Sequence, residues 1–79
     1  MHYKNGREAK AGDMVFRPGI YSGEKPKVGI LYNLEARATT CNAQLASMTP
    51  NDECVTVGDC VHIDDVKAAF EERVEANKG

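Results

Sequence analysis

The sequence lacks an excess of positive charge, because its 10 Lys and Arg residues stand against 12 Asp and Glu, for a formal net charge of −2. Proteins that bind nucleic acid through phosphate contacts depend on a surplus of Lys and Arg, so the composition disfavours nonspecific binding of this kind. No stretch approaches the roughly 18 apolar residues of a membrane-spanning helix, and the start of the chain is polar, unlike a secretion signal. These absences predict a soluble cytoplasmic protein that makes no membrane contact.

Cysteine is scarce and irregularly spaced. Cys41, Cys54 and Cys60 form an odd set with no Cys-x-x-Cys pair, and cytoplasmic thiols stay reduced, so we expect free, partly buried cysteines. A zinc site formed with His62 would be chemically acceptable, but the spacing argues against it. If residues 53–63 formed one strand, Cys60 and His62 would point the same way, and such a pair could lower the thiol pKa. Because a 79-residue chain leaves little room for a pocket, an enzyme or zinc protein centred on this pair ranks third.

Two kinds of ligand-binding motif are also missing. The seven glycines are scattered in turns and form no phosphate-binding loop, and the acidic residues lack the fixed spacing of an EF-hand. We interpret the acidic pairs as turn residues and a helix cap. The sequence therefore predicts no cofactor, no metal site and no catalytic residue. The acidic residues concerned are Asp52, Glu53, Asp59, Asp64 and Asp65.

What is present is a series of short apolar segments separated by turn residues, which predicts a mainly β protein. Residues 27–35 alternate most clearly, as is typical of a strand with one buried face. Gly29 within this strand predicts a bend or bulge. The alternating set is Val28, Ile30, Tyr32 and Leu34. The five strands are expected at residues 14–17, 27–35, 40–48, 53–57 and 61–63.

The connections between the strands follow from Gly and Pro. Residues 18–26 have the composition of a loop and are expected to form the long connection between the first two strands. Residues 49–52 are expected to form a turn after the third strand. On that third strand, the residues expected to share a face are Cys41, Ala43 and Leu45.

The last segment changes from strand periodicity to helix periodicity. Asp64 or Asp65 can cap a helix over residues 64–77, which we expect to cover the strands as a lid. Its outer face is acidic, with Glu71, Glu72 and Glu75, and offers a second surface for a partner. The apolar positions at helical spacing are Val66, Ala69, Phe70 and Val74.

The turns resemble those of an SH3-like barrel. Residues 12–46 place Gly12-Asp13 before one strand and Val28-Gly29 in the next, and this is similar to the KOW type found in ribosomal and transcription proteins. Residues 57–63, "VGDCVHI", are similar to the short 3₁₀ turn and closing strand of that barrel class. The resemblance implies a five-stranded SH3-like small barrel over residues 10–63 with a C-terminal α-helix, in one domain of residues 1–79. The main competing architecture is an α+β roll with an open sheet.

The chain also resembles small proteins of bacteriophages and mobile bacterial elements. Those proteins begin with a Lys-Asn-Gly-x-x-Ala-Lys-x-Gly-Asp run and carry a later Cys-Asn and Gly-Asp-Cys. Here the run is "KNGREAKAGD" at residues 4–13, followed by "CN" at 41–42 and "GDC" at 58–60. The resemblance implies a phage or mobile-element origin.

Charge is unevenly distributed along the chain. Residues 1–37 carry seven basic and four acidic side chains, or +3, whereas residues 38–79 carry three and eight, or −5. Tyr3 and Tyr21 flank this basic half, and if both are exposed an aromatic and basic contact patch can form around the long loop. The competing interpretation, which we favour for Tyr21, is that its ring packs on the mouth of the barrel. The residues expected to bind a partner are Arg17, Tyr21, Lys25 and Lys27.

Two functions fit such a patch. The first is a non-enzymatic adaptor that binds a host or self protein, including a second copy in a homo-oligomer. The alternative is a weak nucleic-acid binder. RNA-binding members of the barrel class carry a dense run of Lys and Arg at the first loop, whereas here Glu24 lies among the basic residues, so the adaptor is our main prediction.

Overall fold

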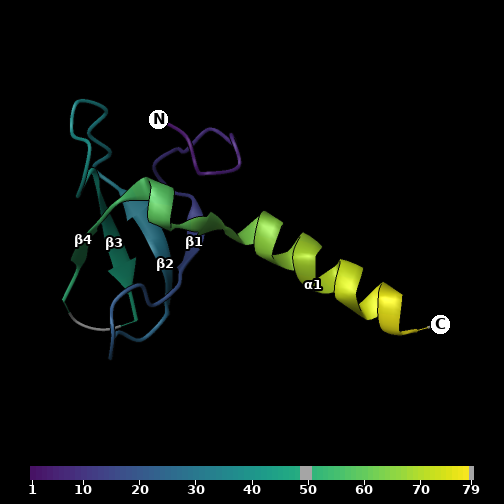
Figure 1. The fold of residues 1–79 in the computed structure, drawn as a ribbon. Coiled ribbons are helices and arrows are strands. Elements are labelled where there is room, and N and C mark those ends of the chain that lie inside the picture. The colour runs from purple at the N-terminus through teal and green to yellow at the C-terminus, as the bar shows by residue number, and fades with distance from the viewer. Residues whose placement is uncertain (49–50, 79) are drawn as a thin grey trace.

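Five antiparallel strands form one sheet, and a long helix follows them, in a computed structural model that describes residues 1–48 and 51–78 (Figure 1). The strand order is β4-β3-β2-β1-β5, so the last strand returns to pair with the first. The prediction of a mainly β chain with a C-terminal helix is confirmed. The elements are β1 (Met14–Arg17), β2 (Lys27–Tyr32), β3 (Ala43–Ser47), β4 (Glu53–Val55), the 3₁₀ helix η1 (Val57–Asp59), β5 (Val61–His62) and α1 (Ile63–Asn77).

The core lies on one face of the sheet and is built from small and branched apolar side chains. Leu31 of β2 lies directly opposite Leu45 of β3, and both are fully buried, as is Val15 of β1. The start of the chain folds over this face and adds Tyr3 and Ala9 to the core. The remaining members are Ala43, Val55, Val57 and Cys60.

Of the two alternating sets in β2, the buried one is not the set of Val28, Ile30 and Tyr32. Gly29 and Leu31 face the core, whereas Val28 is exposed. Pairing with β1 and β3 is continuous through Gly29, so the predicted bulge is wrong. Glycine is required there because a Cβ would collide with the carbonyl oxygen of Ala46 on the neighbouring strand.

The strands β2 and β3 are shorter than predicted because two residues adopt left-handed backbone conformations. Asn33 has φ of 50° and ends β2, and Cys41 has φ of 52° and precedes β3. Ala43 and Leu45 are buried on one face as predicted, but Cys41 is exposed. The turn predicted at residues 49–52 lies partly outside the described residues.

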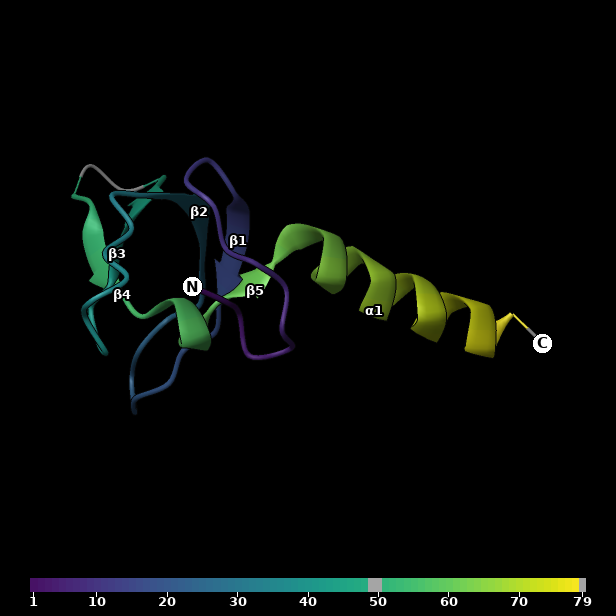
Figure 2. The ribbon, with the colours of Figure 1, turned by 90° about the horizontal axis from the view of Figure 1, so that it is seen from above.

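The helix α1 is not a lid. It begins at Ile63 with His62 as its N-cap, not Asp64 or Asp65, and the His62 Nδ1 accepts a hydrogen bond from the Asp64 N–H at 3.0 Å. No residue of α1 is buried, and the helix projects away from the sheet with its C-terminus at the far end (Figures 1 and 2). Its direction is set by the first turn, where Asp65 pairs with Arg7.

Candidate functional site

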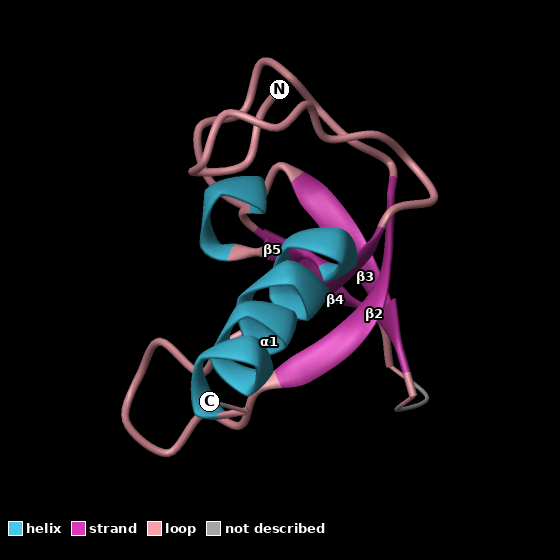
Figure 3. Ribbon diagram, turned by 90° about the vertical axis from the view of Figure 1, so that its right-hand side faces the viewer, coloured by secondary structure: helices cyan, strands magenta, loops and turns pink. Residues whose placement is uncertain are grey.

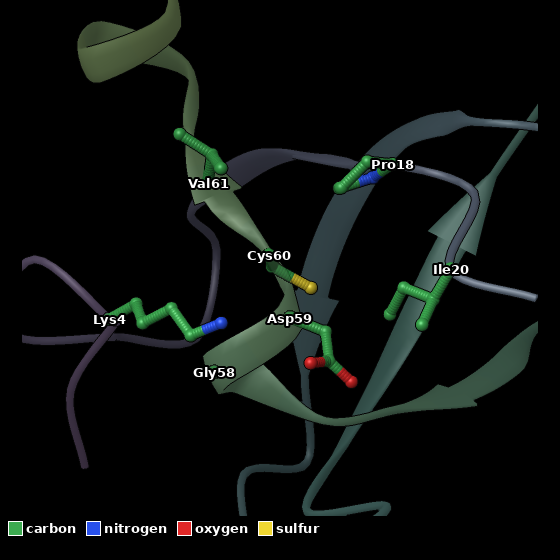
Figure 4. Close-up of a pocket in the computed structure, with 7 residues that line it drawn as sticks. All are labelled: Lys4, Pro18, Ile20, Gly58, Asp59, Cys60 and Val61. Carbon is green, nitrogen blue, oxygen red and sulfur yellow. The ribbon is translucent and has the colours of Figure 1, made fainter.

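A groove lies where the loop after β1 meets the 3₁₀ helix and the start of the chain. Its volume is about 260 Å³, and its walls are mostly apolar. Lys4 reaches toward the 3₁₀ helix from one side, while the Ile20 side chain approaches from the loop, with Cys60 between them (Figure 4). One cation and one anion, Lys4 and Asp59, border the apolar surface. The lining residues are Lys4, Pro18, Ile20, Gly58, Asp59, Cys60 and Val61.

The loop between β1 and β2 is held in shape by Glu24. Its carboxylate accepts a hydrogen bond from the Ile20 N–H at 3.1 Å and pairs with the guanidinium of Arg17. Its own N–H donates to the Tyr21 carbonyl at 3.0 Å, closing a turn through Gly23, whose φ is +81°. The Ile20 hydrogen bond first, and then the Arg17 hydrogen bond, hold the pKa of Glu24 below its usual value. The loop therefore presents its side chains in a fixed arrangement.

The four predicted binding residues divide into two pairs. Arg17 is only 11% exposed and pairs with Glu24, while Lys27 pairs with Glu53 on β4. Both are therefore committed to ion pairs within the fold. Tyr21, at 71% exposure, and Lys25 extend from the loop into solvent and are available to a partner.

Tyr3 is a core residue, and its predicted exposure is wrong. It is 4% exposed, its ring meets His62 edge to face at 5.9 Å between centroids, and its hydroxyl donates to Asp13 Oδ2 at 2.8 Å. Burial, and then this hydrogen bond, raise the pKa of Tyr3. Burial opposes the charge on Asp13, but the hydrogen bonds from the Lys10 N–H and Tyr3 outweigh it, so the pKa of Asp13 is lowered. This contact fastens the start of the chain over the core.

Replacing Tyr3 with Phe is expected to lower the free energy of unfolding by about 1 kcal/mol near neutral pH. Because the folded-state pKa of Asp13 is depressed, its contribution is present above its unfolded pKa of about 3.9 and is lost as the pH falls through the folded value. The raised pKa of Tyr3 adds stability below about pH 10 that is lost at higher pH. In urea denaturation, the unfolding free energy of the variant should therefore fall less than that of wild type at low pH and at high pH.

The matched control for this pH experiment is Tyr21→Phe. Tyr21 is exposed, so removing its hydroxyl should leave the unfolding free energy and its pH dependence unchanged. Equal pH profiles for wild type, Tyr3→Phe and Tyr21→Phe would show that the contact with Asp13 adds no stability.

The cysteines do not form the predicted free set. Cys41 and Cys54 are joined by a disulfide, with 5.2 Å between their Cα atoms, and only Cys60 is free and buried. Burial raises the pKa of Cys60 to about 11, so it is a thiol and not a thiolate at neutral pH. The single strand over residues 53–63 is interrupted by the 3₁₀ helix, and the Cys60 thiol contacts the Thr56 carbonyl at 3.6 Å. The raised pKa of Cys60 is the opposite of the lowering that a thiol–imidazole pair with His62 would produce.

Three of the acidic residues singled out from the sequence have partners within the fold. Asp52 accepts a hydrogen bond from the Tyr32 hydroxyl, Glu53 pairs with Lys27, and Asp65 pairs with Arg7. Within residues 1–48 and 51–78, no group of three or more His, Cys, Asp or Glu is placed to hold a metal ion. In the same residues, no helix has the length and apolar character needed to cross a membrane.

None of the four predicted binding residues lines the groove, and sequence reasoning did not single out Lys4, Ile20 or Asp59 as binding residues, although Ile20 lies in the loop expected to contact a partner. These three residues come from three separate segments, which only the folded chain brings together. Ile20 was the one available signal, because a large apolar residue in a loop rich in Gly and Pro has no obvious core position.

Comparisons with protein families, with curated proteins and with solved structures found no match for this chain.

Proposed function

We propose that this chain is a non-catalytic adaptor from a phage or mobile element, and that it binds a partner protein over the groove and the adjoining loop. The observation that carries the proposal is the placement of Ile20, 44% exposed, and Tyr21 on a loop fixed by Glu24, beside an apolar groove. Aromatic side chains next to apolar hollows are typical of the residues that dominate binding energy in protein interfaces. Lys25 and Lys4 would complement acidic groups at the edge of a partner.

An SH3-like barrel is the fold that we propose for the sheet. Two features support it: β5 returns to pair with β1, and a 3₁₀ helix precedes β5. Seen from above, the strands curve around the core side (Figure 2). In such a barrel the long loop after β1 and the 3₁₀ helix lie at the same end, as they do around the groove.

Nucleic-acid binding is the weaker alternative. Arg17 and Lys27 are paired with Glu24 and Glu53, so Lys25 is the one member of the predicted basic set outside an ion pair of the described residues. A cytoplasmic location stays a prediction. The exposed disulfide Cys41–Cys54 argues against it, since such bonds are more usual in oxidising compartments.

Affinity capture from a bacterial lysate, with wild-type and variant baits, tests the adaptor function. Tyr21→Ala combined with Lys25→Glu should abolish retention of a partner that wild type retains, because both side chains are exposed on the loop. Arg37→Glu is the charge-matched control, since Arg37 is an exposed basic residue between β2 and β3 that does not line the groove. Equal retention by all three baits would contradict the proposed site, and salt-sensitive retention of nucleic acid would favour the alternative.

A further inference from the structure

The outer face of the sheet, opposite the core, is apolar. Side chains alternate along a strand, so the neighbours of buried Val15 and Leu31 point outward. An antiparallel sheet with one wet face normally carries polar residues there, but β1 to β3 carry apolar residues on both faces. Pairing aligns these residues into two cross-strand rows. The first row is Val61, Phe16 and Val28, and the second is Met14, Ile30 and Ala46.

This outer face lies open in the single chain. Met14 and Val28 are 45% and 46% exposed, and Val61 is also exposed. Each side chain alone would be unremarkable, but a contiguous set across β5, β1, β2 and β3 is typical of a surface that another layer covers.

The helix α1 carries an apolar stripe that is equally uncovered. Val66, Phe70 and Val74 recur every four residues on one side, and Phe70 and Val74 are 61% and 55% exposed. Beyond its first turn the helix runs clear of the sheet (Figures 1 and 2), and in the view from its C-terminal side it projects toward the viewer (Figure 3). An isolated helix of about 15 residues is only marginally stable in water, so a packing partner for this stripe would stabilise it.

We propose that a second copy of this chain covers both surfaces: α1 of each copy packs its stripe on the outer sheet face of the other, in a twofold dimer. Charge favours this occupant. The helix carries Glu71, Glu72 and Glu75 in exposed positions, and Lys10 and Lys25 precede the two strands that form the middle of the face. Neither lysine takes part in an ion pair among the described residues.

The area of contact is sufficient for a specific dimer when the exchange is reciprocal. The helix is about 22 Å long and at most about 12 Å wide, so one contact buries two patches of about 260 Å² each in projection. The two contacts of a twofold dimer bury about 1,000 Å², which is close to the minimum for a biological interface. The outer sheet face shares Val61 with the groove, and Lys25 belongs to both proposals, but Ile20 and Tyr21 lie outside the dimer contact, so the dimer does not rest on the proposed function.

Sedimentation equilibrium of the full chain tests the dimer. Wild type should dimerise reversibly, and Val28→Asp or Phe70→Asp should each raise the dissociation constant at least about 30-fold. Ile20→Asp is the matched control: Ile20 is as exposed as Val28 but lines the groove, so this variant should dimerise like wild type. A monomeric wild type at about 1 mM would overturn the proposal.

Mixing the two monomeric variants separates this dimer from the other self-associations. The intact helix of Val28→Asp can still pack on the intact sheet of Phe70→Asp, so the mixture keeps one of the two contacts and should associate more strongly than either variant alone, although less strongly than wild type. A helix-to-helix dimer would tolerate Val28→Asp, and a sheet-to-sheet dimer would tolerate Phe70→Asp; either result, or a mixture that associates no more than the separate variants, overturns the proposal. Near-UV circular dichroism confirms that both variants are folded, since both positions are exposed.

Discussion

Replacing Leu45 with Ala is expected to lower the free energy of unfolding by about 2 to 5 kcal/mol. Leu45 is fully buried on β3 and lies opposite Leu31, so truncation leaves a cavity in the centre of the sheet. The whole domain should have a stability of only about 4 to 12 kcal/mol at its length, so the substitution removes a large fraction of it. Urea denaturation followed by far-UV circular dichroism measures the loss.

The control for Leu45→Ala is Ile20→Ala, which removes a side chain of similar size from an exposed loop. Its effect should stay within about 0.5 kcal/mol. If the two variants lost equal stability, the sheet would not be organised around the Leu31–Leu45 contact, and the order of the strands would have to be questioned.

Local sequence signals located the strands well. β1 occupies residues 14–17 as predicted, because Gly12-Asp13 and Pro18-Gly19 bound a short apolar segment on both sides. The 3₁₀ helix and the short strand β5 also lie where the "VGDCVHI" segment indicated them. These elements depend on turn residues next to them in sequence, so no distant contact was needed to identify them.

Which face of a strand is buried was harder to predict. In β2 both alternating sets are largely apolar, so the period-two pattern identified the strand without indicating its buried side. Burial of Leu31 was decided by its partner Leu45 on β3 and by the close approach of Ala46 to Gly29. The same apolar character on both sides is what leaves an uncovered outer face for a dimer contact.

Features that depend on contacts between distant segments were also missed, because no local sequence pattern indicates them. Tyr3 enters the core through Asp13 and His62, which lie in other segments, and Arg7 directs the helix through Asp65, 58 residues later. The amphipathic pattern of α1 showed that its stripe needs a partner, but it carried no information on which surface provides one. The candidate groove is likewise assembled from three separate segments.

Removing the disulfide by Cys41→Ser with Cys54→Ser is expected to lower the free energy of unfolding by about 2 to 3 kcal/mol, because the bond closes a short loop in the unfolded chain. The loss should be partial, since two hydrogen bonds hold the same segments together: Cys41 N–H to Thr56 Oγ1 at 3.0 Å, and Val57 N–H to Asn42 Oδ1 at 2.8 Å.

Reductant tests the same bond in the wild type and separates it from the effect of the substitutions. Dithiothreitol should lower the unfolding free energy of wild type to that of the double variant, and it should leave the double variant unchanged. Thiol titration of the unfolded, unreduced chain should find one thiol, from Cys60, and reduction should raise the number to three. Three reactive thiols before reduction would contradict the bond and would favour the reduced state expected of a cytoplasmic protein. A result of one thiol would instead show that the segment before β3 is covalently joined to β4. The stability of the protein would then depend on the redox conditions of its compartment.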